Sequence, residues 1–274
     1  MTCTASPLAR RPRNHSRVLL AGWTALVLAF LYLPIVLVVV YSFNDSPYIV
    51  LWKGFSLRWY AAVWRDTELI RTLVNSLIIA SATTLVSCLL GTAAAWLLYR
   101  YRFRGAAMVR ALIFVPLIVP EIILGVSLLL LFTAAHVDLG FTTVTIAHVT
   151  FCFPFVMIAV QARLEGLDPS LEEAALDLGA TPAAAFVRVI LPFLTPAVVA
   201  GGLMAFTLSL DEFIVTYFTY SAAAATLPVN IYGMVKAGPK PTVNALSALL
   251  IFATVVLVAA AEWARKLSAP PPKE

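Results

Sequence analysis

Charged residues are scarce in this chain: Asp, Glu, Lys and Arg make up only 12% of its 274 residues, whereas 61% are hydrophobic. A soluble domain has no use for so much apolar surface, and several apolar runs are long enough to cross a bilayer. The composition therefore excludes an ordinary soluble protein and predicts an integral membrane protein. The net charge of +5 is then best interpreted as a topology bias, not as a sign of nucleic-acid binding.

Several chemistries lack the residues that they need. The sequence contains no G-x-x-x-x-G-K-[ST] loop for binding ATP phosphates, and no Ser/His/Asp or Cys/His set in a catalytic context. The cysteines and histidines are too scattered for a disulfide framework or a metal site: Cys3, Cys88, Cys152, His15, His136 and His148. We therefore expect no enzyme, no metal site and no cofactor on this chain. Any uphill transport must draw its energy from a partner.

Six apolar segments are long enough to span the membrane. We predict spans at about residues 18–43, 73–98, 111–134, 141–161, 189–218 and 244–263. Residues 1–17 are predicted to be a disordered basic tail, and residues 265–274 a second short tail. Residues 18–264 would thus form one all-α transmembrane domain, whose loop at 219–243 is rich in Ala, Gly and Pro.

The arginines favour one orientation of these spans. The short loop after the third span has no Lys or Arg. The short loop 99–110, in contrast, carries four arginines: Arg100, Arg102, Arg104 and Arg110. Because short cytoplasmic loops are enriched in Lys and Arg, both termini and residues 164–188 are predicted to be cytoplasmic.

Local patterns add detail to three segments. Small residues recur four apart in the second span, from Ser76 to Ala95, which predicts close approach by another helix. Pro116 and Pro120 predict a kink or break in the third span. Residues 44–68 are amphipathic and aromatic, which suits the membrane–water boundary. A plain loop and a surface that receives a binding protein are equally open for this segment.

Residues 164–192 stand out as a compact elbow between two spans. Ser170 and Glu173 fit a capping box, and Asp168-Pro169 offers a competing helix start. Gly179 can take the left-handed conformation that ends a helix, and Thr181-Pro182 can begin a second one. The pattern predicts two short helices around a glycine turn, and hence a docking surface. The alternative is an ordinary solvated loop helix with acids in its first turn.

The same segment resembles the EAA signature of ABC-importer permeases. That signature reads EAA, three residues, G, nine residues, I-x-L-P, and it matches Glu173-Ala174-Ala175, Gly179 and Val189-Ile190-Leu191-Pro192, with Val189 in place of Ile. The resemblance implies the six-span type I importer (MetI-like) fold and makes the elbow the coupling helix seated on a separate ATPase. It implies that coupling is carried by Glu172, Glu173, Ala174, Ala175, Gly179 and Pro192.

Three carboxylates lie in the interior of the predicted spans, away from their ends, where charge is costly and usually functional: Glu121, Asp211 and Glu212. No basic residue lies within the spans to neutralise them, so acids along a pathway favour a cationic substrate. Asp211 and Glu212 would point about 100° apart on a helix and are not expected to share one face. Aromatic residues such as Trp96, Tyr217 and Tyr220 could stack on a cation. The alternative for each acid is a bond to backbone or to a hydroxyl on a neighbouring helix.

A wider likeness covers nearly the whole chain after residue 17. Tyr41-Ser42-Phe43-Asn44, Asn75-Ser76-Leu77, Pro120-Glu121-Ile122 and Ser209-Leu210-Asp211-Glu212 are among the segments that resemble spermidine/putrescine importer permeases of the C type. The family usually has Asp where this chain has Glu121. The resemblance implies polyamine import by alternating access, with two ATPase subunits that bind the ATP and Mg, a B-type partner permease and a periplasmic binding protein.

Other functions remain open. Permeases for opines, aminoethylphosphonate and iron share parts of the pattern. A secondary transporter would need no ATPase and should show an internal hydropathy repeat, but the elbow does not recur. A membrane scaffold or receptor subunit would have an elbow but no need for acids within its spans.

Overall fold

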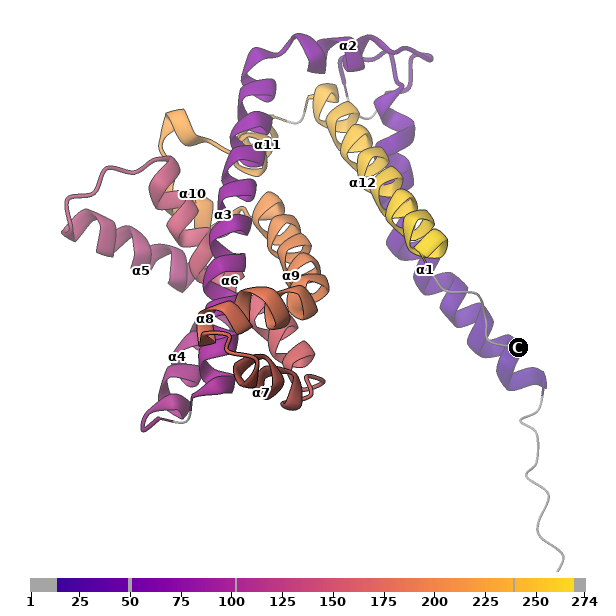
Figure 1. Ribbon diagram of the computed structural model, residues 1–274. Coiled ribbons are helices and arrows are strands. Elements are labelled where there is room, and N and C mark those ends of the chain that lie inside the picture. Colours follow the sequence, from indigo (N-terminus) through magenta and orange to yellow (C-terminus); the bar gives the residue numbers. More distant parts are fainter. Residues whose placement is uncertain (1–13, 49–50, 102, 239, 269–274) are drawn as a thin grey trace, which may run out of the picture. The chain divides into compact units, whose positions relative to one another are not determined.

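The computed structural model describes residues 14–48, 51–101, 103–238 and 240–268 (Figure 1). This part of the chain is almost entirely helical, with one isolated antiparallel bridge between Asn44 and Phe55. Contacts divide the chain into two compact units, one built from its two ends and the other from Asp66–Lys236. The all-α prediction is therefore confirmed for the described residues.

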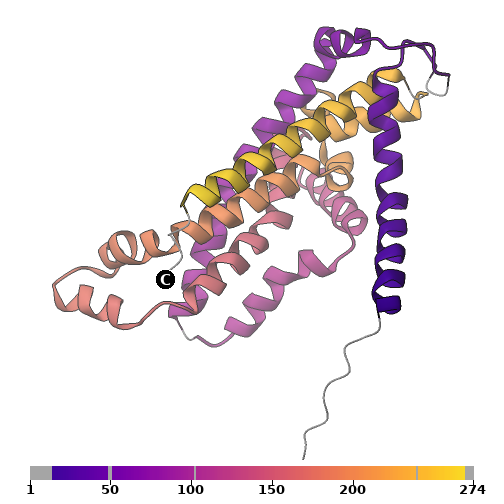
Figure 2. The same ribbon diagram turned by 90° about the vertical axis from the view of Figure 1, so that its right-hand side faces the viewer.

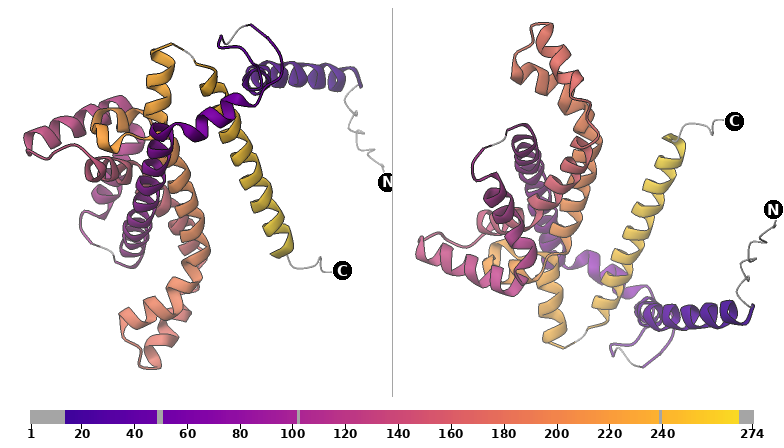
Figure 3. Two further views of the ribbon diagram at one scale, coloured as in Figure 1. Left: turned by 90° about the horizontal axis from the view of Figure 1, so that it is seen from above. Right: turned by 90° about the horizontal axis from the view of Figure 1, so that it is seen from below.

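The first unit consists of α1 (Asn14–Ser42), α2 (Arg58–Arg65) and α12 (Pro241–Ser268). Helix α12 contacts both α1 and α2, as can be followed in Figure 3. Between α1 and α2 the chain folds back through Asn44, whose side chain donates to the Leu51 carbonyl (2.7 Å) and accepts from the Lys53 N–H (2.9 Å). The aromatic segment predicted at the boundary is thus a folded turn with a short helix.

The second unit contains the remaining helices: α3 (Thr67–Arg100), α4 (Ala106–Ile118), α5 (Glu121–Ala134), α6 (Phe141–Leu164), α7 (Ser170–Asp177), α8 (Pro182–Ala185), the π-helical turn η1 (Phe186–Ile190), α9 (Leu191–Asp211), α10 (Ile214–Thr219), the 3-10 turn η2 (Ala222–Ala224) and α11 (Leu227–Lys236). Helices α3, α6 and α9 run side by side and form its centre (Figure 2). Val156, Val160, Ile190 and Leu194 are fully buried in the core that they share.

Glycines allow these three helices to approach closely. A Cβ on Gly91 of α3 would lie 2.8 Å from the Val156 Cβ and 2.9 Å from the Met157 backbone nitrogen on α6. A Cβ on Gly201 of α9 would lie 3.0 Å from the Val156 Cα. The small-residue pattern in the second span therefore marks a buried helix interface, as expected.

We expect Gly91→Ala to destabilise the protein, because backbone atoms of α6 occupy the space of the new methyl group. Overpacking of this kind costs about 1–3 kcal/mol, which should lower the midpoint of thermal unfolding in detergent. The matched control is Gly22→Ala on α1, where a Cβ would have nothing within 4 Å. Equal midpoints for the two variants would contradict the close packing of α3 on α6.

Four helical segments are long and apolar enough to cross a membrane: 17–42, 67–100, 141–164 and 182–211. Helices α4 and α5 would make a fifth span as one bent pair, with an angle of 109° at the break before Glu121. The break falls at Val119 and Pro120, as predicted for Pro120, whereas Pro116 lies inside α4. The described apolar part of α12, Pro241–Val256, is a shorter stretch.

Two predictions about the later part of the chain are wrong. Residues 189–218 are not one helix, because α9 ends at Asp211 and Glu212 has extended backbone angles (φ −68°, ψ 119°). The expected 100° separation of Asp211 and Glu212 on a helix therefore does not apply. Residues 219–243 are not only a loop, since they contain α11. Helix α11 runs from Leu227 to Lys236 although its second residue is Pro228. A proline is tolerated there because the N–H groups of the first turn have no partner within the helix.

Candidate functional site

The first helix of the elbow, α7, follows the start signal at Asp168-Pro169 and not the Ser170 capping box, which was the other predicted start. The Asp168 side chain accepts a hydrogen bond from the Ser170 backbone N–H (3.0 Å), and Pro169 already has helical angles (φ −56°, ψ −27°). The Ser170–Glu173 capping box is therefore wrong, because Ser170 lies inside the first turn and does not precede it. The backbone N–H and hydroxyl of Ser170 lower the pKa of the Asp168 carboxyl below its ordinary value.

The turn between α7 and α8 has the geometry that the sequence predicts. Gly179 is left-handed, with φ of +87°. The Gly179 N–H donates to the Leu176 carbonyl (2.9 Å) and the Ala180 N–H to the Ala175 carbonyl (3.1 Å), which is the paired closure of a Schellman motif. Thr181 then caps α8 by accepting from the Ala184 N–H (3.2 Å), with Pro182 in the first helical position.

The elbow is fastened to the end of α3 by two contacts. The Arg100 guanidinium donates to the Glu172 carboxylate (2.8 Å), and only 14% of the Glu172 side chain is exposed. The ring of Trp96 packs on that of Phe186, with centroids 5.3 Å apart. Trp96 thus belongs to the base of the elbow and not to an aromatic lining for substrate. Figure 2 shows the elbow projecting beyond the ends of α6 and α9.

Apolar side chains face outward on the elbow. Leu178, beside the glycine turn, is 90% exposed, and Leu171 is 45% exposed. Ala174, Glu173 and Gly179 are exposed as well, and a Cβ on Gly179 would meet nothing within 4 Å. Two exposed leucines on a capped turn outside the long apolar helices suit a surface that another protein covers.

Pro192, the last residue of the predicted coupling set, lies apart from this surface. It is in the first turn of α9, directly after the π-helical turn η1. The Leu191 N–H donates to the Phe186 carbonyl across that wider turn. Proline offers no N–H to the carbonyl four residues back, so the wider turn lets the chain pass from elbow to span without a break. The sequence pattern did not predict this turn.

Of the three acids, Glu212 is the one with a structural partner. It is buried, at 8% exposure, and its carboxylate accepts from the Val215 N–H at the start of α10 (2.8 Å). The Glu212 backbone carbonyl accepts from the Thr216 hydroxyl (3.0 Å). Glu212 therefore caps α10. For this acid the structure shows the alternative given above, a bond to backbone.

Asp211 and Glu121 are free of such a role. Asp211 is the exposed last residue of α9, and Glu121 is half-buried in the first turn of α5. Helix α5 packs on α10, where a Cβ on Gly125 would lie 2.7 Å from the Phe218 ring. Glu121 lies at the start of α5, and Glu212 lies between Asp211 and α10, the helix on which α5 packs. Among the described residues, none of the three acids forms an ion pair.

Aromatic rings gather around Tyr217 on α10, the helix that follows Asp211 and Glu212. Its ring lies 5.7 Å from that of Phe213, 5.9 Å from Tyr232 on α11 and 6.3 Å from Tyr220. Phe213 and Tyr232 are closer still, at 4.8 Å. Tyr217 remains 42% exposed. Aromatic faces beside unpaired carboxylates can attract a cation and cover its methylene groups at once.

His148 of α6 was not predicted to have any role. Its Nδ1 lies 2.7 Å from the Ser209 Oγ of α9, and its Nε2 lies 2.7 Å from the Thr216 Oγ1 of α10. It therefore holds both sides of the helix break that contains Asp211 and Glu212. The described residues contain no group of three metal-ligating side chains. A partner 61 or 68 positions away leaves no local signal in the sequence.

Comparison with known proteins gives this geometry a context. The family model described as "Binding-protein-dependent transport system inner membrane component" matches residues 87–271. The spermidine/putrescine transport system permease protein PotC of Escherichia coli (strain K12) is 39% identical over 246 residues, covering 90% of this chain and 93% of that protein. The putrescine transport system permease protein PotI of the same strain is 42% identical, covering 92% and 90%. PotC of Haemophilus influenzae is 41% identical, covering 85% and 90%.

Solved structures share the fold. A chain of a bacterial ABC transporter involved in alginate import superposes with a TM-score of 0.70 at 15% identity, covering 96% of this chain and all of that one. A chain of the inward-facing MetNI methionine ABC transporter gives 0.60 at 19% identity, covering 76% and 99%. The fold of this chain is therefore that of ABC-importer permeases.

Proposed function

This chain belongs to the family of binding-protein-dependent transport system inner membrane components, and from that premise we propose that it is a permease subunit of an ATP-driven polyamine importer. Its substrate would be putrescine or spermidine, carried into the cytoplasm by alternating access. The observation that carries the substrate class is that Asp211 and Glu121 have no ion pair among the described residues, while the rings around Tyr217 lie on and near α10, the helix that follows Asp211 and packs on α5. Relatives named for spermidine and putrescine transport support it.

The chemistry of a polyamine fits this arrangement. Its ammonium groups are separated by methylene chains, so it needs anionic groups at intervals and apolar faces between them. Asp211 and Glu121 supply negative charge from two different helices, and Phe213, Tyr217 and Tyr232 supply ring faces. Glu212 adds charge to the same region while it holds α10 in place.

The energy for transport would come from partners. The elbow, residues 164–188, would seat on one of two ATPase subunits, which bind the ATP and Mg. Leu178, Ala174 and Gly179 are the exposed groups that would enter that seat. A B-type permease would complete the membrane pathway, and a periplasmic binding protein would deliver the substrate. One of the transporters with this fold is known in complex with its periplasmic protein.

The membrane arrangement follows from this assignment. We propose six spans: α1, α3, the bent pair α4–α5, α6, the run α8–α9 with α10, and α12. Both tails, residues 1–17 and 265–274, would then be cytoplasmic, together with the elbow, in a bacterial inner membrane. The contact of Arg100 with Glu172 supports one side for the 99–110 loop and the elbow.

Uptake in cells tests the substrate class. Cells that lack only this chain are expected to lose uptake of labelled putrescine or spermidine, and cells that carry it to regain uptake. Unlabelled opine, aminoethylphosphonate and ferric competitors should leave that uptake unchanged. Unchanged polyamine uptake after deletion, in a strain without a second polyamine importer, would refute the substrate assignment and point to one of those solutes.

A further inference from the structure

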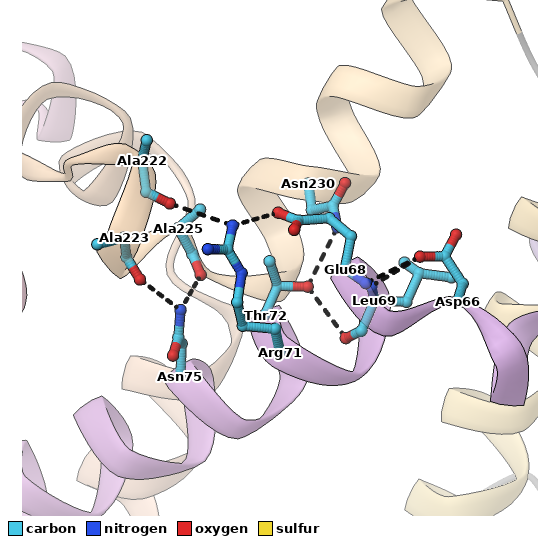
Figure 4. Close-up of polar contacts among 10 residues, drawn as sticks. All are labelled: Asp66, Glu68, Leu69, Arg71, Thr72, Asn75, Ala222, Ala223, Ala225 and Asn230. Carbon is cyan, nitrogen blue, oxygen red and sulfur yellow. Dashed lines mark hydrogen bonds and ion pairs between the residues drawn. The ribbon is translucent and has the colours of Figure 1, made fainter.

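The end of α3 away from the elbow holds the loop between α10 and α11. The two N–H groups of the Asn75 side chain donate to the carbonyls of Ala223 (3.0 Å) and Ala225 (2.9 Å), as Figure 4 shows. The adjacent Ser76 hydroxyl accepts from the Leu227 backbone N–H (2.8 Å). Asn75 is 6% exposed and Ser76 2%. These bonds satisfy carbonyls that no helix satisfies, so they fix the 220–227 loop to α3.

Two further contacts extend this attachment. Arg71 donates to the Ala222 carbonyl (3.3 Å) while paired with Glu68 (2.6 Å). The Asn230 amide of α11 donates to the Thr72 hydroxyl (3.2 Å). All of these residues of α3 lie in its first three turns, which Figure 4 shows facing the loop and α11. The 220–227 loop and the start of α11 are therefore held by one face of one helix end.

The other end of the same helix holds the elbow, through Arg100–Glu172 and Trp96–Phe186. Helix α3 has 34 residues without a proline, which corresponds to a length of about 50 Å. It is therefore a continuous rod with the elbow at one end and the 220–227 loop at the other, as the positions of α7 and α11 along α3 in Figure 1 show.

The loop matters because of what it joins. It connects α10, which carries Tyr217, to α11, which carries Tyr232, and these two rings are 5.9 Å apart. Moving the loop relative to α3 would change the spacing of these two rings. The elbow helices α7 and α8, in contrast, make no extensive contact with α10 or α11.

We propose that α3 transmits movement of the elbow to the 220–227 loop, and that Asn75 is the positioning residue that fastens the loop to the helix. The inference rests on the proposed function of the chain as an ATP-driven permease. Asn75 suits the role because an amide offers two donors in one plane, and both are used on carbonyls two residues apart. Ser76 adds the third point of attachment.

The test compares Asn75→Leu, which keeps the size of the side chain but removes both donors, with Ser81→Leu on the exposed face of the same helix. Hydrogen exchange of residues 220–227 is measured in the assembled complex, without nucleotide and trapped with ATP, Mg and vanadate. In the wild type and in Ser81→Leu, nucleotide should change the exchange rate of the loop by at least about threefold. In Asn75→Leu this response should disappear, while that of residues 170–185 persists.

Transport gives the second readout of the same variants. In liposomes, Asn75→Leu should lower the substrate moved per ATP hydrolysed at least about tenfold, with ATPase activity within about twofold of wild type. Loss of uptake and ATPase in proportion to the amount of assembled complex would show a purely structural role and overturn the proposal. The proposal would also be overturned if nucleotide did not change the hydrogen exchange of residues 220–227 in the wild type. The exchange measurement needs no substrate, so an error in the polyamine assignment would appear only in wild-type uptake.

Discussion

Replacing Gly179 by Asp should abolish association of the chain with its ATPase while leaving the chain in the membrane. Gly179 has a φ of +87°, a conformation that costs a residue with a side chain about 1 kcal/mol or more. The larger effect comes from the surface itself. A side chain there would meet nothing in this chain and would project beside Leu178, which is 90% exposed. A charge would therefore enter the apolar seat that the partner provides.

Gly105→Asp is the matched control for this prediction. Gly105 is also left-handed, with φ of +96°, and a Cβ there would also meet nothing within 4 Å. It lies at the start of α4, outside the elbow. Detergent-solubilised complexes should contain wild-type amounts of ATPase for Gly105→Asp and less than about a tenth for Gly179→Asp. Normal co-purification with Gly179→Asp would refute the docking role of the elbow.

Neutralising Asp211 should lower uptake far more than it lowers assembly of the complex. Asp211 is exposed at the end of α9 and has no ion-pair partner among the described residues, so Asp211→Asn breaks no ion pair in this part of the chain. It removes one negative charge from the path of a cation. At about 4 Å and an effective dielectric constant near 20, one charge pair is worth about 4 kcal/mol. Even a third of that energy corresponds to about a tenfold loss.

The measurement is initial uptake of labelled putrescine at several concentrations, at equal amounts of assembled complex. Asp138→Asn is the control, since Asp138 is exposed in the turn between α5 and α6 and lies outside the aromatic and acidic region. Its uptake should match the wild type within about twofold. Equal uptake for Asp211→Asn would remove Asp211 from the pathway.

Substitutions of Glu212 should affect folding, unlike that of Asp211, because Glu212 caps α10. Glu212→Gln keeps an oxygen that can accept from the Val215 N–H, whereas Glu212→Ala leaves the start of α10 without that cap. Loss of a cap costs about 1 kcal/mol. We therefore expect Glu212→Ala to reduce the amount of folded permease more than Glu212→Gln does. Similar amounts of both variants would show that the cap contributes little.

Local interactions explain which parts of the elbow were predictable. Gly179 ends α7 and Thr181-Pro182 begin α8 because the bonds involved join residues at most five positions apart. The same holds for the break after Pro120. The start of α7 was ambiguous because two overlapping signals compete within three residues, and the one with Asp168 and Pro169 prevails.

Long-range contacts explain what the pattern missed. Apolar residues continue through 189–218, so hydropathy alone predicted one span. The break after Asp211 is stabilised by Glu212 on α10 and by His148, which comes from α6 and bonds to both sides. Likewise, in the sequence Asn75 is only a polar residue within an apolar run. Its hydrogen-bond acceptors lie in a loop more than 140 positions away, so only the folded chain shows its role.

The sequence by itself predicted a helical membrane protein with a capped elbow, and the EAA signature in that elbow resembles that of importer permeases. Composition and the positions of arginine are properties of whole segments, and a glycine turn depends on a few neighbouring residues. All three can therefore be recognised from the sequence. Only the tertiary structure decided which acid caps a helix, which acids form no ion pair among the described residues, and that α3 contacts both the elbow and the 220–227 loop. These outcomes depend on hydrogen bonds between helices distant in sequence, and their partners exist only once the chain has folded.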